Sequence, residues 1–132
     1  MTDIPVTLTA AGVLGLMYMG LSFNVVRYRV RTRTMLGDGA GKPGGEALNV
    51  AIRVHGNFME YVPLALILLG GIEAAGAPRM MIVLLAAALV VSRLMHPFGM
   101  TKPAPNFFRA GGAMLTYMVI IVASVTALTI AW

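Results

Sequence analysis

Long apolar runs separated by short polar stretches dominate the hydrophobic pattern of this chain. Four such runs are visible, approximately at Ile4 to Val26, Leu48 to Ala75, Met80 to Met95 and Phe107 to Trp132. Each is close to the ~20 residues that an α-helix needs to cross the hydrocarbon core of a bilayer. The pattern therefore predicts an all-α protein: one integral membrane four-helix bundle over residues 1–132, with almost no sequence left for a second domain.

The composition agrees with a membrane protein. The 132 residues are 58% hydrophobic and only 11% charged, with a mean hydropathy of +0.83, which is outside the range of ordinary soluble domains. The first run is too long for a signal-peptide core and lacks a basic leader, so we expect it to remain as a helix. The absence of cysteine excludes disulfides and a protein thiol nucleophile, so any sulfur chemistry must come from a ligand.

The net charge of +5 is strongly segregated along the chain. The cations cluster after the first run, at the start of the second run and around the connection between the third and fourth runs, namely at Arg27, Arg29, Arg31, Arg33, Lys42, Arg53, Arg93, Lys102 and Arg109. Arg79 alone lies at the other end. The positive-inside rule places the basic loops in the cytoplasm, and both termini and the Glu73 to Arg79 turn outside. This segregation argues against a nucleic-acid surface, and attraction to anionic lipid is an alternative use of the cluster.

A polar row follows one edge of the second run. Asn49, Arg53, Asn57 and Glu60 are spaced i, i+4, i+8 and i+11, which places them on one side of a helix. Ionised groups at membrane depth are costly and face a protein interior or a wet cavity. An internal Arg53–Glu60 salt bridge is one interpretation; the other is a binding surface. Guanidinium groups suit carboxylates and Glu60 suits an ammonium, so the favoured guest is a small zwitterion with several carboxylates.

Other polar side chains are less specific. His55 lies about 200° around the helix from Arg53, which is typical of a packing histidine. His96 sits beside Arg93 and could join a site, but two histidines without a third ligand predict no metal site. Tyr61 flanks the row and could donate a hydrogen bond to a guest or serve as an interfacial anchor, whereas Tyr117 is expected in the core.

Small residues mark two expected helix contacts. The first run contains Gly12, Gly15, Gly20 and Ser22, which allow a neighbouring helix to come close, and the fourth repeats Ala123, Ala127 and Ala131 at four-residue spacing.

The string Arg53-Val-His-Gly-Asn57-Phe-Met-Glu60-Tyr61-Val-Pro63-Leu64 resembles the signature of the membrane-associated proteins in eicosanoid and glutathione metabolism, the MAPEG family. Further similarity lies in Gly37-Asp38-Gly39, and in Arg93-Leu-Met-His96-Pro-Phe-Gly99 followed by Arg109, which look like the bacterial branch. The resemblance covers about residues 20 to 115, and the four apolar runs match the four-helix fold of the family.

The resemblance implies a homotrimer in the bacterial inner membrane, with glutathione held between neighbouring subunits near the cytoplasmic leaflet. By similarity, glutathione is bound by Arg31, Arg53, Asn57, Glu60, Tyr61 and Arg93. Arg109 matches the arginine that holds the thiolate in transferase members, and is the candidate catalytic residue. The implied activity is a glutathione transferase or peroxidase that acts on a lipophilic electrophile from the bilayer.

The chain departs from the eicosanoid-forming relatives at His96 and Met100, where those proteins carry tyrosines. Two other functions stay open at this point. A small proton-coupled exporter would also have four helices and a membrane carboxylate, but Arg53 and Asn57 beside Glu60 favour its ionised form and oppose proton exchange. A non-catalytic scaffold would use the polar row only for assembly.

Overall fold

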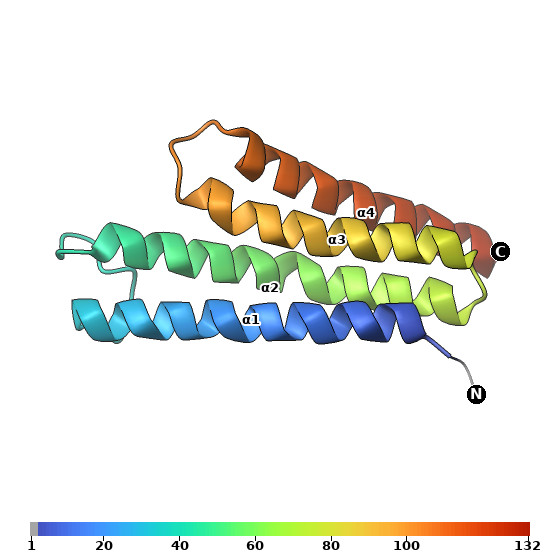
Figure 1. The fold of residues 1–132 in the computed structure, drawn as a ribbon, viewed down its shortest axis with the longest axis horizontal. Helices are drawn as coiled ribbons and strands as arrows, with labels where there is room; N and C mark the ends of the chain where they lie inside the picture. The colour runs from blue at the N-terminus through green and yellow to red at the C-terminus, as the bar shows by residue number, and fades with distance from the viewer. Residues whose placement is uncertain (1–2) are drawn as a thin grey trace.

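The computed structural model describes residues 3–132 and contains four long helices. They are α1 (Pro5–Thr32), α2 (Gly45–Ala74), α3 (Arg79–Met100) and α4 (Phe107–Ala131), and each is long and apolar enough to span a membrane. The helices run alternately up and down. Both termini lie at the end of the bundle that carries the short α2–α3 turn, and the longer α1–α2 and α3–α4 loops lie at the other end (Figure 1). The predicted membrane-spanning four-helix bundle is confirmed.

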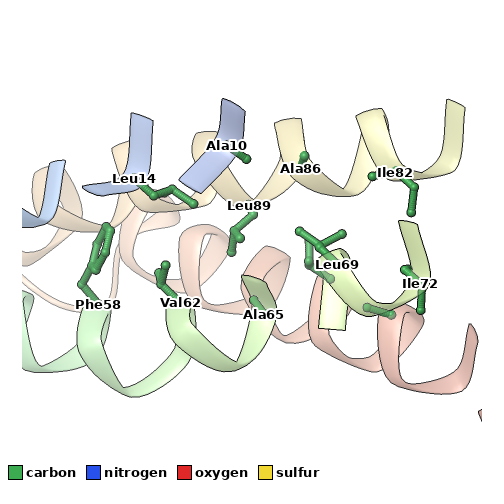
Figure 2. Packing of buried hydrophobic residues seen from close by; sticks show 12 residues of the cluster. Ala10, Leu14, Phe58, Val62, Ala65, Leu69, Ile72, Ile82, Ala86 and Leu89 are labelled. Carbon is green, nitrogen blue, oxygen red and sulfur yellow. The ribbon is translucent and has the colours of Figure 1, made fainter. Parts of the chain in front are cut away.

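Helices α2 and α3 form the middle of the bundle. Helix α1 packs against both of them, α4 packs against both from the other side, and α1 and α4 do not contact each other within residues 3–132. Figure 2 shows apolar side chains of α1, α2 and α3 converging on one another, with Leu14, Val62, Leu69, Ile82 and Leu89 among them. The buried core therefore follows the length of α2.

Two helices extend past the C-terminal ends of the predicted apolar runs. Helix α1 continues from Val26 to Thr32 and ends where Arg33 adopts a left-handed backbone conformation. Helix α3 continues from Met95 to Met100 and includes Pro97. Both extensions are polar or interrupted by proline, so hydrophobicity alone did not show them; a proline near a helix end removes only one hydrogen bond.

The N-terminus of α1 is tied to the C-terminal end of α2. The Glu73 carboxylate accepts hydrogen bonds from the backbone N–H groups of Val6 (3.0 Å) and Thr7 (2.8 Å). Pro5 has no N–H to satisfy, and Ile4 provides no side-chain cap. Glu73 therefore supplies from another helix the acceptors that an N-terminal turn ordinarily obtains locally.

Helices α3 and α4 cross closely through glycines. A Cβ added at Gly99 would overlap the backbone of Phe108 and Arg109, and one added at Gly112 would lie 3.0 Å from the Ser92 carbonyl oxygen. A Cβ added at Gly12, Gly15 or Gly20 would have no atom of another described helix within 4 Å. The close packing predicted for the α1 glycines is therefore not used within one chain, whereas Ala123 is fully buried and Ala127 packs against the core.

Candidate functional site

The polar row of α2 lies on the outside of the bundle. Asn49, Arg53 and Glu60 are exposed, and the same face continues past Glu60 with the exposed apolar side chains Leu64 and Ile67. Among residues 3–132 no ion pair joins Arg53 to Glu60, although both lie in a helix that can span a membrane. The internal salt bridge is thus absent from the described chain, and this face stays open to a ligand or a second subunit.

Arg93 lies behind this row and is only 1% exposed. Its Nη1 donates to Asn57 Oδ1 at 2.8 Å, and its Nη2 donates to the Gly112 carbonyl at 3.4 Å and to the Thr116 hydroxyl. Its Nε donates to Ser92 Oγ at 3.4 Å. All three guanidinium nitrogens therefore have partners inside the chain, and Asn57 is the only one of these partners on the α2 row.

The hydroxyl groups around Arg93 form a chain of their own. Thr116 Oγ1 donates to Ser92 Oγ at 2.9 Å or to the Gly112 carbonyl at 2.9 Å, and Ser92 Oγ donates to the Leu89 carbonyl at 2.7 Å. Every acceptor around the guanidinium is neutral. Arg93 consequently keeps its positive charge uncompensated by an anion of the described chain, in an environment where charge is costly to bury.

Tyr61 meets a tyrosine of α4 at the edge of the polar row. Its hydroxyl lies 3.5 Å from that of Tyr117, and the ring centroids are 5.4 Å apart. Tyr117 was predicted as a core residue, but it is 41% exposed. That prediction is wrong because the α4 face that carries Tyr117 turns outward beside α2, and the phenol pair sits at the rim.

The two remaining predicted side chains form no hydrogen bond or ion pair with the row among residues 3–132. Arg31 is exposed near the end of α1, and Arg109 is exposed in the first turn of α4. The Arg109 backbone N–H donates to the Asn106 side chain at 2.9 Å, which caps α4, while no hydrogen bond of the described chain engages its guanidinium. Both guanidinium groups remain free to reach a ligand.

The MAPEG family model matches residues 7–129, which is nearly the whole chain and includes the row, Arg93 and Arg109. The chain belongs to the MAPEG family. The resemblance drawn from the α2 motif is therefore confirmed.

Two relatives of the chain are named inner membrane protein YecN, from Escherichia coli strain K12 and from Escherichia coli O6:H1 strain CFT073. Each is 38% identical to this chain over 96 residues, an alignment that covers 73% of this chain and 70% of the relative. No solved structure matches the chain significantly. The comparisons thus establish the family, but the names of the relatives specify neither a ligand nor a reaction.

The two histidines of this MAPEG protein lie in packed positions. His55 Nε2 lies 3.0 Å from Ser22 Oγ, and its ring packs on Tyr18 with centroids 4.9 Å apart, as expected of a packing histidine. His96 is buried at the α3–α4 crossing, with its backbone next to Gly112. Among the described residues, no three His, Cys, Asp or Glu side chains are grouped as metal ligands.

A separate cavity of about 560 Å³ opens between α1, α2 and α3 at the basic end of the bundle. Mostly apolar residues line it, together with Asn24, Tyr28, Glu46 and Lys102. None of the residues predicted to bind the guest lines it. The row on α2 and this cavity are therefore different places in one chain.

Sequence reasoning missed the groups that hold Arg93, namely Ser92, Gly112 and Thr116. A signal existed, because Gly112 and Thr116 are spaced i, i+4 and thus share one face of α4. A buried guanidinium must find several acceptors, and small or hydroxyl-bearing residues on a neighbouring membrane helix commonly provide them.

Proposed function

We propose that this MAPEG protein binds glutathione and uses it as a transferase or peroxidase toward lipophilic electrophiles that enter from the bilayer. The supporting observation is the open polar row of α2. It presents Arg53 and Glu60 at the surface of one chain, without ionic partners among residues 3–132, in a helix that can span a membrane. A membrane protein shields such charges, so the row requires a partner subunit or a polar guest.

The chemistry of the row fits a tripeptide with two carboxylates and one ammonium group. Arg53 offers a planar fork to a carboxylate, the Asn57 amide offers donors beside it, and Glu60 offers an anion to the ammonium. Tyr61 adds a phenol at the rim. These side chains hold and orient the ligand, and Arg93 supports Asn57 from behind.

Glutathione supplies a thiol whose deprotonated form is the nucleophile. The protein's part is to favour that form and to keep it near the bilayer. A cation beside a thiol lowers its pKa and raises the fraction of thiolate at neutral pH. Arg109 fits this task because its guanidinium is exposed and the described chain offers it no hydrogen-bond partner. Arg31 is available in the same way from the end of α1.

A homotrimer would complete the site. The outer face of α2 combines the polar row with the exposed apolar residues Leu64 and Ile67, so a neighbouring subunit could bury the apolar part while the polar part holds the guest. We place the protein in an inner membrane, as the name of its relatives suggests, with the basic end in the cytoplasm and both termini outside.

Isothermal titration of the detergent-purified protein with glutathione tests the proposal. We expect binding in the millimolar range or tighter, and substantial loss of binding in Arg53→Ala. Glu60→Gln should lose affinity but keep the oligomer, measured by light scattering corrected for detergent. Absence of glutathione binding by the wild-type protein would refute the proposal. Dissociation of the Glu60→Gln oligomer would favour the scaffold, and proton-driven substrate uptake into vesicles would favour the exporter.

A further inference from the structure

Arg93 and Asn57 suggest how the site distinguishes one end of its ligand from the other. We propose that Arg93 is a positioning residue: it fixes the Asn57 side chain with its NH₂ group toward the outer face of α2, and thereby makes this point of the row a carboxylate subsite. This inference rests on the proposed function and refines it. The family resemblance implied that Arg93 touches the tripeptide itself, whereas the geometry points to an indirect role.

The orientation of the Asn57 amide follows from the chemistry of its partner. A guanidinium carries only N–H donors, so the Asn57 atom that faces Arg93 Nη1 at 2.8 Å has to be the carbonyl oxygen. The NH₂ group then occupies the other branch of the planar amide, away from the buried Arg93. Within residues 3–132 this NH₂ group has no hydrogen-bond acceptor. Asn57 therefore presents two donors and no acceptor to a guest.

The α3–α4 crossing holds Arg93 in place. Its Nη2 bonds with the Gly112 carbonyl and the Thr116 hydroxyl, and its Nε bonds with Ser92. Because the residue is 1% exposed and bonded on three nitrogens, it has little freedom to turn. A guanidinium fixed in this way holds the amide in one orientation even before a ligand arrives, which lowers the entropic cost of binding.

The charges around Asn57 also favour the carboxylate end of a ligand. Arg93 is a buried cation whose acceptors are all neutral, and Arg53 lies one helical turn before Asn57 on the same face. The NH₂ donors therefore lie in a positive field that attracts a carboxylate and repels an ammonium group. Glu60 follows almost one turn later and has the opposite preference. The row thus orients a zwitterion, with a carboxylate at Asn57 and its ammonium group toward Glu60.

An isosteric substitution tests the orientation with little change in shape. In Asn57→Asp one carboxylate oxygen still accepts from Arg93, but the other replaces the NH₂ group and opposes a ligand carboxylate. We expect the affinity for glutathione, measured by isothermal titration, to fall at least tenfold, because a favourable donor becomes a like charge. The melting temperature in detergent should stay within a few degrees of the wild-type value.

Asn24→Asp provides a matched control. Asn24 Oδ1 accepts from Arg27 Nη2 at 2.9 Å, so this substitution makes the same charge change in the same kind of Arg–Asn pair, on α1 and outside the row. It should leave glutathione affinity within twofold of the wild type. An equal loss in Asn24→Asp and Asn57→Asp would overturn the inference, because it would show an effect of net charge alone.

The role of Arg93 is tested by Arg93→Met and its conservative counterpart Arg93→Lys. Methionine leaves Asn57 free to turn and should weaken glutathione binding about tenfold, while lysine keeps a donor and a charge and should recover part of the affinity. Should Arg93→Met fail to fold, the affinity of Asn57→Asp for glutathione remains as the test of the inference. Undiminished glutathione binding by Asn57→Asp refutes the carboxylate subsite only, whereas failure of the wild-type protein to bind glutathione refutes the proposed function.

Discussion

Arg53 on the outer face of α2 and Arg93 at the α3–α4 crossing lie in the same half of the bundle, yet their surroundings differ. Arg93 is buried and bonded through three nitrogens to Asn57, Gly112, Thr116 and Ser92. Arg53 is exposed and has no ionic partner in the described chain. All the hydrogen-bond partners of Arg93 lie within one chain, so changes at the crossing should alter stability, and they should alter binding only where they act through Asn57. The outer face is open, so changes there should alter what the protein binds.

The largest expected effect is at Gly99, which lies at the α3–α4 crossing. A Cβ at this position would overlap the backbone of Phe108 and Arg109, which cannot move without separating α3 from α4. Gly99→Ala should lower the free energy of unfolding by about 3 kcal/mol, the upper range for overpacking. Unfolding in mixed detergent micelles measures it.

Gly56 is the matched position near the open face. A Cβ there would meet no atom within 4 Å, so Gly56→Ala should leave the free energy of unfolding unchanged or slightly increase it, as alanine favours helix. A large loss of stability in Gly56→Ala would contradict the assignment of this face as open. Loss of the oligomer alone would instead locate a subunit contact at Gly56.

Arg109, in the first turn of α4, is tested through activity because it is the candidate catalytic residue. Arg109→Ala should reduce the rate of conjugation of glutathione with a lipophilic electrophile about 100-fold, comparable to removing one charge-stabilising donor from an active site. The affinity for glutathione should stay near the wild-type value, because Arg53, Asn57 and Glu60 remain. Steady-state kinetics with 1-chloro-2,4-dinitrobenzene, together with titration of glutathione, separates the two effects.

Arg109→Lys is the informative companion, since it keeps the positive charge. Partial recovery of the rate is expected. Full activity in Arg109→Ala would show that another group favours the thiolate, and equal losses of binding and rate would make Arg109 a binding residue.

The sequence was sufficient for the membrane spans and for the polar row. Four apolar runs of about the length of a bilayer core leave little choice of architecture. The row could be found because Arg53, Asn57 and Glu60 lie on one helix, where spacing alone fixes which side chains share a face. Predictions of this kind need no knowledge of how the helices pack.

Contacts between helices could not be found in the same way. Glycines in α1, α3 and α4 look alike in the sequence, yet among residues 3–132 only Gly99 of α3 and Gly112 of α4 lie at a close crossing of two helices. The partners of Arg93 on α4 and the outward position of Tyr117 depend on how each helix is rotated about its axis. That rotation is set by the packing of whole faces, and a single residue pattern does not specify it.

Glu73 and Glu60 extend the comparison to two glutamates of the same helix. The Glu73 carboxylate accepts from the N–H groups of Val6 and Thr7, so Glu73→Ala should lower the free energy of unfolding by about 2 kcal/mol, the upper range for loss of a helix cap. Glu73→Gln retains one acceptor and should cost less. Glu60→Ala, which removes no bond of the described chain, should change stability by less than about 0.5 kcal/mol.

Unfolding in mixed micelles and proteolysis of the α1 N-terminus would measure these effects. A destabilisation by Glu60→Ala as large as that of Glu73→Ala would mean that Glu60 has a structural partner in the assembled protein. The outer face of α2 would then not be open to a ligand at Glu60.

Ser22 of α1 contacts His55 on the side of α2 opposite to Arg53, and its loss should cost less stability than that of Gly99→Ala or Glu73→Ala. Its hydroxyl lies 3.0 Å from the Tyr18 carbonyl and 3.0 Å from His55 Nε2. Since the hydroxyl has one proton, His55 Nε2–H must be the donor whenever Ser22 donates to Tyr18. Ser22→Ala removes both contacts and should lower the free energy of unfolding by about 1 kcal/mol, the typical net value of a hydrogen bond. Glutathione affinity should not change, because His55 lies on the side of α2 opposite to Arg53; a loss of affinity without a loss of stability would instead place His55 in the binding site.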